Sequence, residues 1–200
     1  MKEEKKESVL EVIKARRSER SFKKTQITDE ELSAILEAGQ YAPTGGNLQT
    51  VHFIVIQKAE VLKELVFLIT QEFRKMELTE DLYISIQNGI KKARKGDYHF
   101  FYDAPTLIVV SNQKSNQNGM ADVACAIENI MLEATELGLG NCWVNQIRWL
   151  DDNPTVHAYM EKLGLGKNET VCGAVAIGYK ENEIKREAPE RKGMRVTYVK

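Results

Sequence analysis

The stretch AIENIMLEATELGLGNCWV, residues 126–144, decides the fold predicted for this chain. Within it and just before it, apolar residues cover most of a helix circumference, which predicts a helix over about 120–137 buried at the centre of the molecule. These residues are Val123, Ala124, Ile127, Ile130, Met131 and Ala134. Gly138 is a natural C-terminal stop for this helix, and residues 141–144 are expected to continue as a short extended segment.

Further helices and strands are predicted on both sides of the central helix. Two Ser/Thr-x-x-Glu capping boxes begin the first two helices, and an Asn-Pro pair begins the last. The predicted helices cover about residues 9–17, 29–39, 59–76, 84–93, 120–137 and 154–163. Runs rich in β-branched and aromatic residues predict buried strands over 52–57, 106–112 and 170–179. The pattern indicates one α+β domain over residues 1–200, with roughly four or five strands and five or six helices.

Two segments depart from this pattern. Residues 77–102 combine a weak helical signal with an aromatic cluster between 98 and 102, and we expect them to form a variable lid or insertion. Residues 180–200 form a charged tail. Apolar residues alternate from 194 to 199, which predicts a final strand that pairs outside the main body.

Composition narrows the possible classes of function. Lys+Arg number 28 and Asp+Glu 29, giving a net charge of -1, so a strongly electrostatic nucleic-acid binder is disfavoured. The N-terminus lacks the apolar core of an export signal, and the longest aliphatic and aromatic run, Leu65 to Ile69, is too short to span a membrane. Three widely spaced cysteines fit neither a disulfide framework nor a CxxC motif. The cytoplasm is therefore the expected compartment.

A basic cluster follows the first predicted helix. Arg16, Arg17, Ser18 and Arg20 place three guanidinium groups and a hydroxyl within five residues. Guanidinium forks match phosphate oxygens, and such charge-assisted hydrogen bonds are strong. Taken alone, the cluster is better explained as a solvated basic face at a helix C-terminus.

Two glycine-containing segments are the other candidates for a binding site. Residues 42–49 join a helix to a buried strand, and their glycines would let backbone amides approach a flat ligand. Residues 138–146 join the central helix to an extended segment with amides free to face a ligand. A simple turn and a helix cap next to a core Trp are the alternative interpretations. P-loop and dinucleotide fingerprints are missing, and the three histidines have no metal-ligand or relay spacing.

Taken together, these segments resemble the FMN-dependent nitroreductase family along almost the whole chain. The matching stretches are RRSERSF (16–22), YAPTGGNLQTVHFIVI (41–56), AIENIMLEATELGLGNCWV (126–144) and AIGYKENEIKREAPERK (176–192). The resemblance implies a central antiparallel or mixed sheet flanked by helices, an intertwined homodimer, and two FMN sites at the dimer interface.

The resemblance also implies roles for particular residues. The FMN phosphate and ribityl chain would be held by Arg16, Arg17, Ser18, Arg20 and Arg191. The loop that reaches the flavin of the partner subunit would include Pro43, Thr44, Gly45, Asn47 and Gln49. The segment lying against the isoalloxazine ring would include Cys142, Trp143, Asn145 and Gln146.

Several departures from the family pattern concern these same segments. Thr50-Val51 stands where the family usually has Pro-Trp, and Thr44 replaces Ser. Asn145-Gln146 replaces a Glu-Gly or Gly-Gly pair, so a bulkier side chain would narrow one face of the ring.

The implied activity is an NAD(P)H-dependent reduction through FMN. NADH or NADPH would give hydride to the flavin, and an electrophilic small molecule such as a nitroaromatic or a quinone would then be reduced. No side chain is assigned as a catalytic acid or base, and no metal is implied. Dehalogenation, reduction of an activated alkene, and a non-catalytic FMN-binding or sequestering role are the alternatives. Nucleic-acid binding through residues 16–24 is disfavoured by the charge balance.

Overall fold

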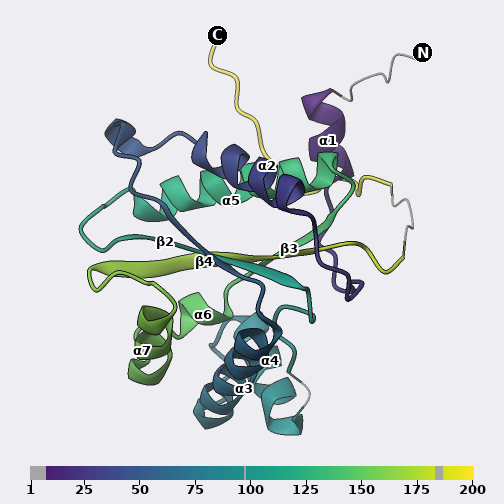
Figure 1. Ribbon diagram of the computed structural model, residues 1–200. Coiled ribbons are helices and arrows are strands. Elements are labelled where there is room, and N and C mark those ends of the chain that lie inside the picture. The colour runs from purple at the N-terminus through teal and green to yellow at the C-terminus, as the bar shows by residue number, and fades with distance from the viewer. Residues whose placement is uncertain (1–7, 97, 183–186) are drawn as a thin grey trace.

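A four-stranded antiparallel sheet forms the middle layer of the protein (Figure 1). This computed structural model describes residues 8–96, 98–182 and 187–200. The strands are β1 (His52–Ile56), β2 (Thr106–Gln113), β3 (Gly140–Val144) and β4 (Glu169–Gly178), in the order β1-β2-β4-β3. The two central strands, β2 and β4, are almost continuously buried, as expected for strands covered on both faces.

One face of the sheet is covered by α2 (Asp29–Gln40) and α5 (Gly119–Glu136) (Figure 1). α5 is the central helix predicted from the sequence. Its Ile127 and Ile130 are fully buried against Ile108 of β2 and Val175 of β4. Gly138 follows α5 with a φ of +77°, and the Leu139 N–H donates to the Ala134 carbonyl, so glycine ends the helix as predicted. α1 (Val9–Ala15) lies beside α5.

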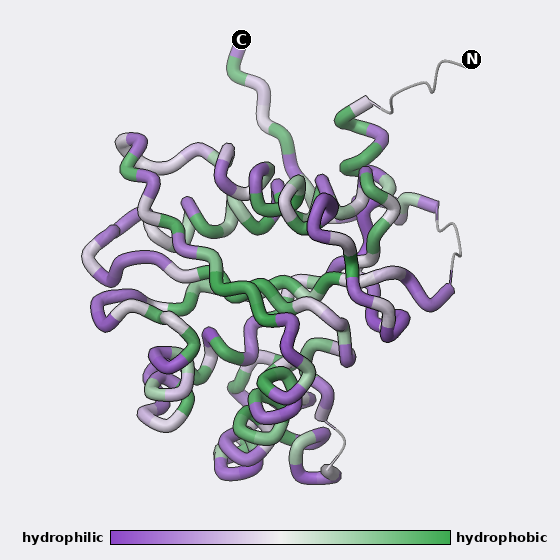
Figure 2. Tube along the Cα trace, viewed as in Figure 1, coloured by the Kyte–Doolittle hydropathy of each residue, from purple (hydrophilic) through white to green (hydrophobic). Residues whose placement is uncertain are grey.

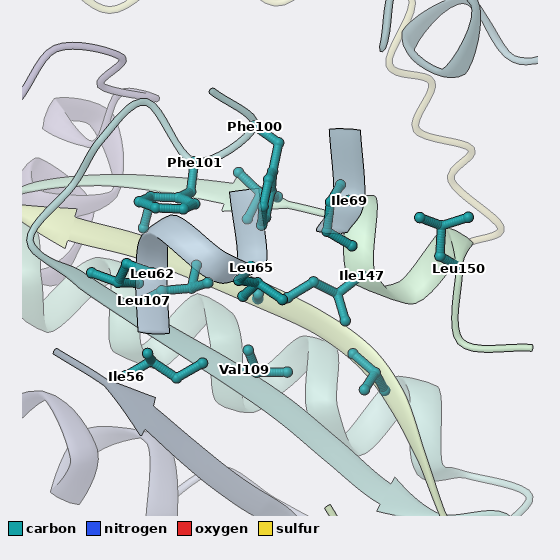
Figure 3. Close-up of a cluster of buried hydrophobic side chains, with 14 of the residues drawn as sticks. Ile56, Leu62, Leu65, Ile69, Phe100, Phe101, Leu107, Val109, Ile147 and Leu150 are labelled. Carbon is teal, nitrogen blue, oxygen red and sulfur yellow. The ribbon is translucent and has the colours of Figure 1, made fainter. Parts of the chain in front are cut away.

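The opposite face is covered by α3 (Ala59–Lys75), α4 (Ile84–Lys95), α6 (Gln146–Trp149) and α7 (Pro154–Lys162). Figure 3 shows Phe100 and Phe101 in the same apolar cluster as Leu65 of α3 and Leu107 of β2. Part of the segment predicted to be a lid therefore belongs to the core. Figure 2 shows hydrophobic residues concentrated along the sheet and on the inner helix faces.

The α+β class, the four strands and the antiparallel sheet are confirmed. Both predicted capping boxes are present, at Ser8 and Thr28. The first helix ends at Ala15, two residues earlier than predicted, because Arg16 adopts an extended ψ of 130° and the chain turns toward β3. The helix count was too low, since the described residues form seven α-helices, including the four-residue α6, and a 3-10 turn (η1, Gly45–Asn47).

The predicted C-terminal strand does not form within this chain, and its pairing outside the main body stays a prediction. Residues 187–200 contain no strand, and the alternating apolar side chains between 194 and 199 are exposed. An extended segment forms a strand only when a neighbouring strand pairs with its backbone, and the end of the tail instead runs away from the body (Figure 1). Position 97 of the predicted lid and positions 183–186 of the tail lie outside the described residues.

Candidate functional site

The basic cluster after α1 is fastened to the start of β3. Ser18 forms an isolated parallel bridge with Asn141, and the Glu19 N–H donates to the Asn141 carbonyl at 2.8 Å. Gly140 makes this close passage possible, because a Cβ there would lie 3.1 Å from both Glu19 Cβ and Phe22 Cε1. The second glycine of the Gly-Leu-Gly stretch thus admits the basic segment beside the sheet.

Arg20 is the cation that this arrangement places in a cleft. Its Nε donates to the Tyr102 hydroxyl at 3.3 Å, and its guanidinium carbon lies 5.8 Å from the centre of the Tyr102 ring. The hydrogen bond with Tyr102 raises the pKa of Arg20 further, so the group stays charged. Aromatic stacking of this kind holds a guanidinium in place while leaving donors free for an anion.

The cleft has a volume of about 580 Å³ and draws its walls from four parts of the chain. They are the segment after α1, the exposed face of α4, the loop at 98–103 and the start of α6. Three cations, Arg20, Lys24 and Lys92, are among its lining side chains. The complete lining is Arg20, Ser21, Phe22, Lys24, Ser85, Asn88, Gly89, Lys92, Tyr98, His99, Phe100, Tyr102, Asp103 and Gln146. Its aromatic, amide and cationic groups suit a planar ligand that carries negative charge.

Tyr98 contributes a buried hydroxyl to the cleft wall. Its ring packs edge-on against Phe73, with centroids 5.1 Å apart, and a Cβ at Gly89 would lie 2.5 Å from its hydroxyl. Gly89 therefore makes room for this oxygen in α4, despite the cost of glycine within a helix. Burial raises the pKa of Tyr98, against an opposing contribution from the Gln146 side chain, so the hydroxyl is neutral. The hydroxyl oxygen is fully buried and makes no geometrically defined hydrogen bond among the described residues.

A second, mostly apolar cavity of about 590 Å³ adjoins the cleft. The two share Lys24, His99 and Asp103 in their linings. His99 Nδ1 and Asp103 Oδ1 are 2.6 Å apart. Tyr102 and Asp103 have positive φ values of 61° and 54°, a strained conformation for residues other than glycine. The loop between the cavities is thus held in a costly conformation that directs Tyr102 at Arg20 and Asp103 at His99.

The remaining predicted arginines do not line this cleft. Arg16 Nε lies 4.0 Å from Glu128 Oε1 of α5. Arg17 turns away and donates to the backbone carbonyls of Lys14, Arg16 and Glu187. Arg191 is exposed in the tail.

The extended segment at β3 divides between the two faces of the sheet. Cys142 belongs to the cluster on the α3 side, and burial raises the pKa of its thiol. Trp143 packs with the cluster on the α5 side and donates to Asn145 Oδ1 at 2.9 Å. Gln146 reaches the cleft, and its Oε1 accepts from the Asn145 N–H at 3.0 Å. Of the residues predicted here, Gln146 is the one that lines the cleft.

The loop at 43–49 lies against the start of α5, in the opposite helix layer, and contributes nothing to the cleft lining. Thr44 Oγ1 accepts from the Gln49 N–H at 3.1 Å, and the Gln49 side chain donates to Asn47 Oδ1 at 3.0 Å. Pro43 lies immediately before Thr44, at the start of this loop. The structure thus places Arg20 and Gln146 in the cleft and a second set of predicted residues in this loop. The others belong to neither place: Arg16, Arg17, Ser18, Cys142, Trp143, Asn145 and Arg191.

Several cleft residues were not predicted from the sequence. Lys24, Asn88, Lys92 and Tyr98 all line the cleft. The spacing of Asn88 and Lys92 places them on one helix face, which was the available signal. Among the described residues there is no cluster that could hold a metal ion, and no helix is long and apolar enough to cross a membrane.

The sequence profile of the Nitroreductase family matches residues 13–179, so the chain belongs to that family, and the predicted resemblance is confirmed. A relative from Archaeoglobus fulgidus, provisionally named as an NADH dehydrogenase/NAD(P)H nitroreductase, is 30% identical over 177 residues, covering 88% of each chain. An NADPH-flavin oxidoreductase from Vibrio harveyi is 26% identical over 91% of this chain and 70% of its own.

Solved structures show the same fold. A nitroreductase with bound FMN from Bacteroides fragilis superposes with a TM-score of 0.85 and 39% identity, covering 97% of this chain and 100% of its own. A second nitroreductase with bound FMN, from Desulfitobacterium hafniense, has a TM-score of 0.79 and 27% identity, covering 96% and 98%.

Proposed function

We propose that this protein is an FMN-dependent oxidoreductase that uses NADH or NADPH to reduce electrophilic small molecules such as nitroaromatics or quinones. The observation that carries the proposal is the cleft that brings Arg20, Lys24, Lys92 and Gln146 together from separate parts of the chain. Relatives named as NAD(P)H oxidoreductases and similar structures with bound FMN support it.

The residues of the cleft fit FMN by their chemistry. A dianionic phosphate needs fixed cations and hydrogen-bond donors, which Arg20 and Ser18 supply. Arg16, Arg17 and Arg191 remain candidates for the same group. A planar heterocycle needs flat walls and polar groups at its edges, which Tyr98, Tyr102 and Gln146 offer. When bound, FMN supplies the hydride chemistry, by accepting hydride from a nicotinamide and passing reducing equivalents to the second substrate.

The chain's own residues contribute positioning and charge. Lys24 and Lys92 would stabilise negative charge that develops on a ring in the cleft during reduction. Phe100 and the rings of Tyr98 and Tyr102 exclude water from one wall. We assign no side chain as an obligatory acid or base.

We further propose a homodimer in which the loop at 43–49 completes the cleft of the partner subunit. Two features support this arrangement. The loop lines none of its own subunit's cleft, and apolar side chains of α1 and the tail are exposed, including Val9 at 72% and Val199 at 95%.

The visible absorption spectrum of the purified protein tests the proposed function, followed by anaerobic addition of NADH and then NADPH. We expect flavin absorption bands that bleach with at least one donor and return when menadione or nitrofurazone is added. Bound FMN without NAD(P)H oxidation would point to a flavin-sequestering protein. A colourless protein that cannot be reconstituted with FMN would refute the proposal.

A further inference from the structure

The loop between α2 and β1 has an unusual backbone conformation. Gly46, Asn47 and Gln49 all have positive φ, at 60°, 55° and 52°. For Asn and Gln this conformation costs free energy, and it persists only where the surroundings fix it. The hydrogen bonds within the loop hold its outer part, so its attachment to the body must come from elsewhere.

Asp122, in the first turn of α5, provides that attachment. Its side chain is almost completely buried, with the residue 4% exposed. Oδ1 accepts from the Gly45 N–H at 2.9 Å, and Oδ2 accepts from Asn116 Nδ2 at 3.0 Å. In the part of the chain that the structure describes, no cation pairs with this carboxylate. The positive end of the α5 dipole and these two N–H donors stabilise the buried carboxylate, and its two oxygens in turn join the loop to Asn116.

A second tie fixes the other end of the loop. Asn116 Nδ2 also donates to Thr50 Oγ1 at 3.3 Å, and Thr50 Oγ1 donates to Asn112 Oδ1 at 2.8 Å. The orientation of the Asn116 amide is set because its Oδ1 accepts from the Asn118 N–H at 2.9 Å. The loop is therefore held at Gly45 and at Thr50 by one network.

Close packing beneath the loop leaves it little room to move inward. A Cβ on Gly45 would lie 2.4 Å from Asn118 Nδ2. On the outer side, Asn47, Leu48 and Gln49 are exposed. The network thus fixes the backbone from below while the outer side chains face outward.

We propose that Asp122 is a positioning residue for the cofactor site, which sets the loop in the conformation that presents Asn47 and Gln49 to a flavin in the partner subunit. The proposal rests on the proposed function, because the loop has this task only if FMN binds between two copies of the chain. Asp122 itself touches neither cofactor nor substrate in this arrangement.

The Asp122→Asn variant tests the role. The new amide can accept from the Gly45 N–H, but its NH₂ group then faces Asn116 Nδ2, a second donor whose orientation Asn118 fixes. We expect the Kd for FMN to rise about tenfold, in line with losing a hydrogen bond to a charged group. The absorption bands of the bound flavin should shift, while the far-UV circular dichroism and the dimer remain.

The reciprocal exchange provides a rescue. In the double variant Asn116→Asp/Asp122→Asn, the new carboxylate accepts from the new amide and still accepts from the Asn118 N–H. We expect the FMN Kd and the flavin spectrum to return most of the way to the wild-type values, because the exchange restores the contact at position 122 but removes the donor from position 116 to Thr50 Oγ1. Rescue of stability without rescue of FMN affinity would overturn the proposal.

Asp151→Asn is the matched control. Asp151 also accepts a backbone N–H, from Val171 at 3.1 Å, and a hydroxyl, from Thr170, but it lies between α6 and α7 and these hydrogen bonds involve neither the loop at 43–49 nor Asn116. We expect this variant to lose stability and keep the wild-type FMN Kd. Equal loss of FMN in both single variants, or an unchanged Kd in a folded Asp122→Asn, would overturn the role.

Thr50→Val covers the case in which Asp122→Asn does not fold. This substitution keeps the shape of the side chain and removes the hydrogen bonds that Thr50 Oγ1 makes with Asn116 and Asn112. We expect the FMN Kd to rise about threefold, as for loss of a neutral hydrogen bond. An unchanged Kd in this variant contradicts the proposal. A wild-type protein that binds no FMN would instead overturn the proposed function itself, so the two failures are distinguishable.

Discussion

Arg20 depends on one aromatic side chain for its position. Tyr102 accepts a hydrogen bond from its Nε and lies beneath its guanidinium. Tyr102 and the following Asp103 both have positive φ, at a cost of about 1–3 kcal/mol each. The protein maintains this strain at the cleft, which is where positioned side chains matter most.

Replacing both Arg16 and Arg20 by Ala is expected to weaken FMN binding about a hundredfold, because two charge-assisted hydrogen bonds to a phosphate are lost. The fold should survive, since neither side chain belongs to the apolar core. Equilibrium titration with FMN, followed by flavin fluorescence, measures the effect.

Lys14→Ala/Lys23→Ala removes the same charge from the neighbouring surface and is the control. Neither lysine lines the cleft. FMN affinity should be nearly unchanged in this variant. If Arg16→Ala/Arg20→Ala retains full FMN occupancy, the assignment of these arginines to the phosphate is wrong.

Individual residues of the candidate site were predictable from the sequence where they belong to a local motif. Ser18, Arg20 and Gln146 stand in motifs, and the structure brings Arg20 and Gln146 into the cleft and Ser18 beside it. Lys92 and Tyr98 belong to the segment where no motif was found, and only the tertiary fold shows that they line the same cleft as Arg20. The direction of the Arg17 side chain depends on a contact with Glu187, 170 residues away, which no local pattern encodes.

At the level of elements, Glu169 joins three strands at one end of the sheet. Its Oε2 accepts from Ser111 of β2 at 2.9 Å and from the Gly166 N–H at 3.0 Å, and it lies 2.9 Å from His52 Nδ1 of β1. Burial opposes ionisation of Glu169, but the hydrogen bonds from His52, Gly166 and Ser111 outweigh it and lower its pKa below the ordinary 4.5.

The lowered pKa predicts a pH-dependent contribution to stability. The ionised carboxylate stabilises the fold fully above its unfolded-state pKa of 4.5, and this contribution is lost as the pH falls through the lower folded-state pKa. Glu169→Gln should therefore be less stable than the wild type at neutral pH, with a difference that shrinks on acidification. Urea unfolding at a series of pH values measures it.

Ser111→Ala provides the matched comparison, since it removes one donor and keeps the carboxylate. The folded-state pKa of Glu169 should then move toward its ordinary value, and the pH-dependent part of the stability should decrease. A difference between wild type and Glu169→Gln that stays constant with pH would contradict this account.

Helices and strands were predictable where the sequence carries its own boundaries. α2 and α7 begin after Thr28 and Asn153, whose side chains accept hydrogen bonds from backbone N–H groups of the first turn. β2 and β4 are nearly continuous apolar runs, which predict buried strands. The tail forms no strand within the chain, because alternation of apolar residues gives a segment a periodicity without supplying a neighbouring strand. α6 has only four residues and no side-chain cap, so it left no signal in the sequence.

For the whole molecule, the exposed apolar surface is the feature that one chain does not explain. Val9, Leu10 and Ile13 of α1 are exposed, as is Tyr41 at the end of α2. Between α1, α2 and α5 lies a groove of about 320 Å³ that includes Val9, Val12 and Tyr41. Such a surface, in a chain whose charged tail also exposes four apolar side chains, is typical of a protein that exchanges segments with a second copy.

Ending the chain at Gly193 tests this arrangement and keeps Arg191. It removes four exposed apolar side chains, Met194, Val196, Tyr198 and Val199. If these side chains are buried against a partner, the dimer dissociation constant of the truncated chain should be about a hundredfold or more higher. The FMN affinity of the truncated chain should then fall on dilution, because the loop at 43–49 would leave the partner's cleft. Sedimentation velocity and FMN titration over a dilution series measure both effects. A full-length chain with Ser at the same four positions should behave like the truncated one; a truncated chain that stays dimeric at wild-type dilutions would show that the tail does not hold the two copies together.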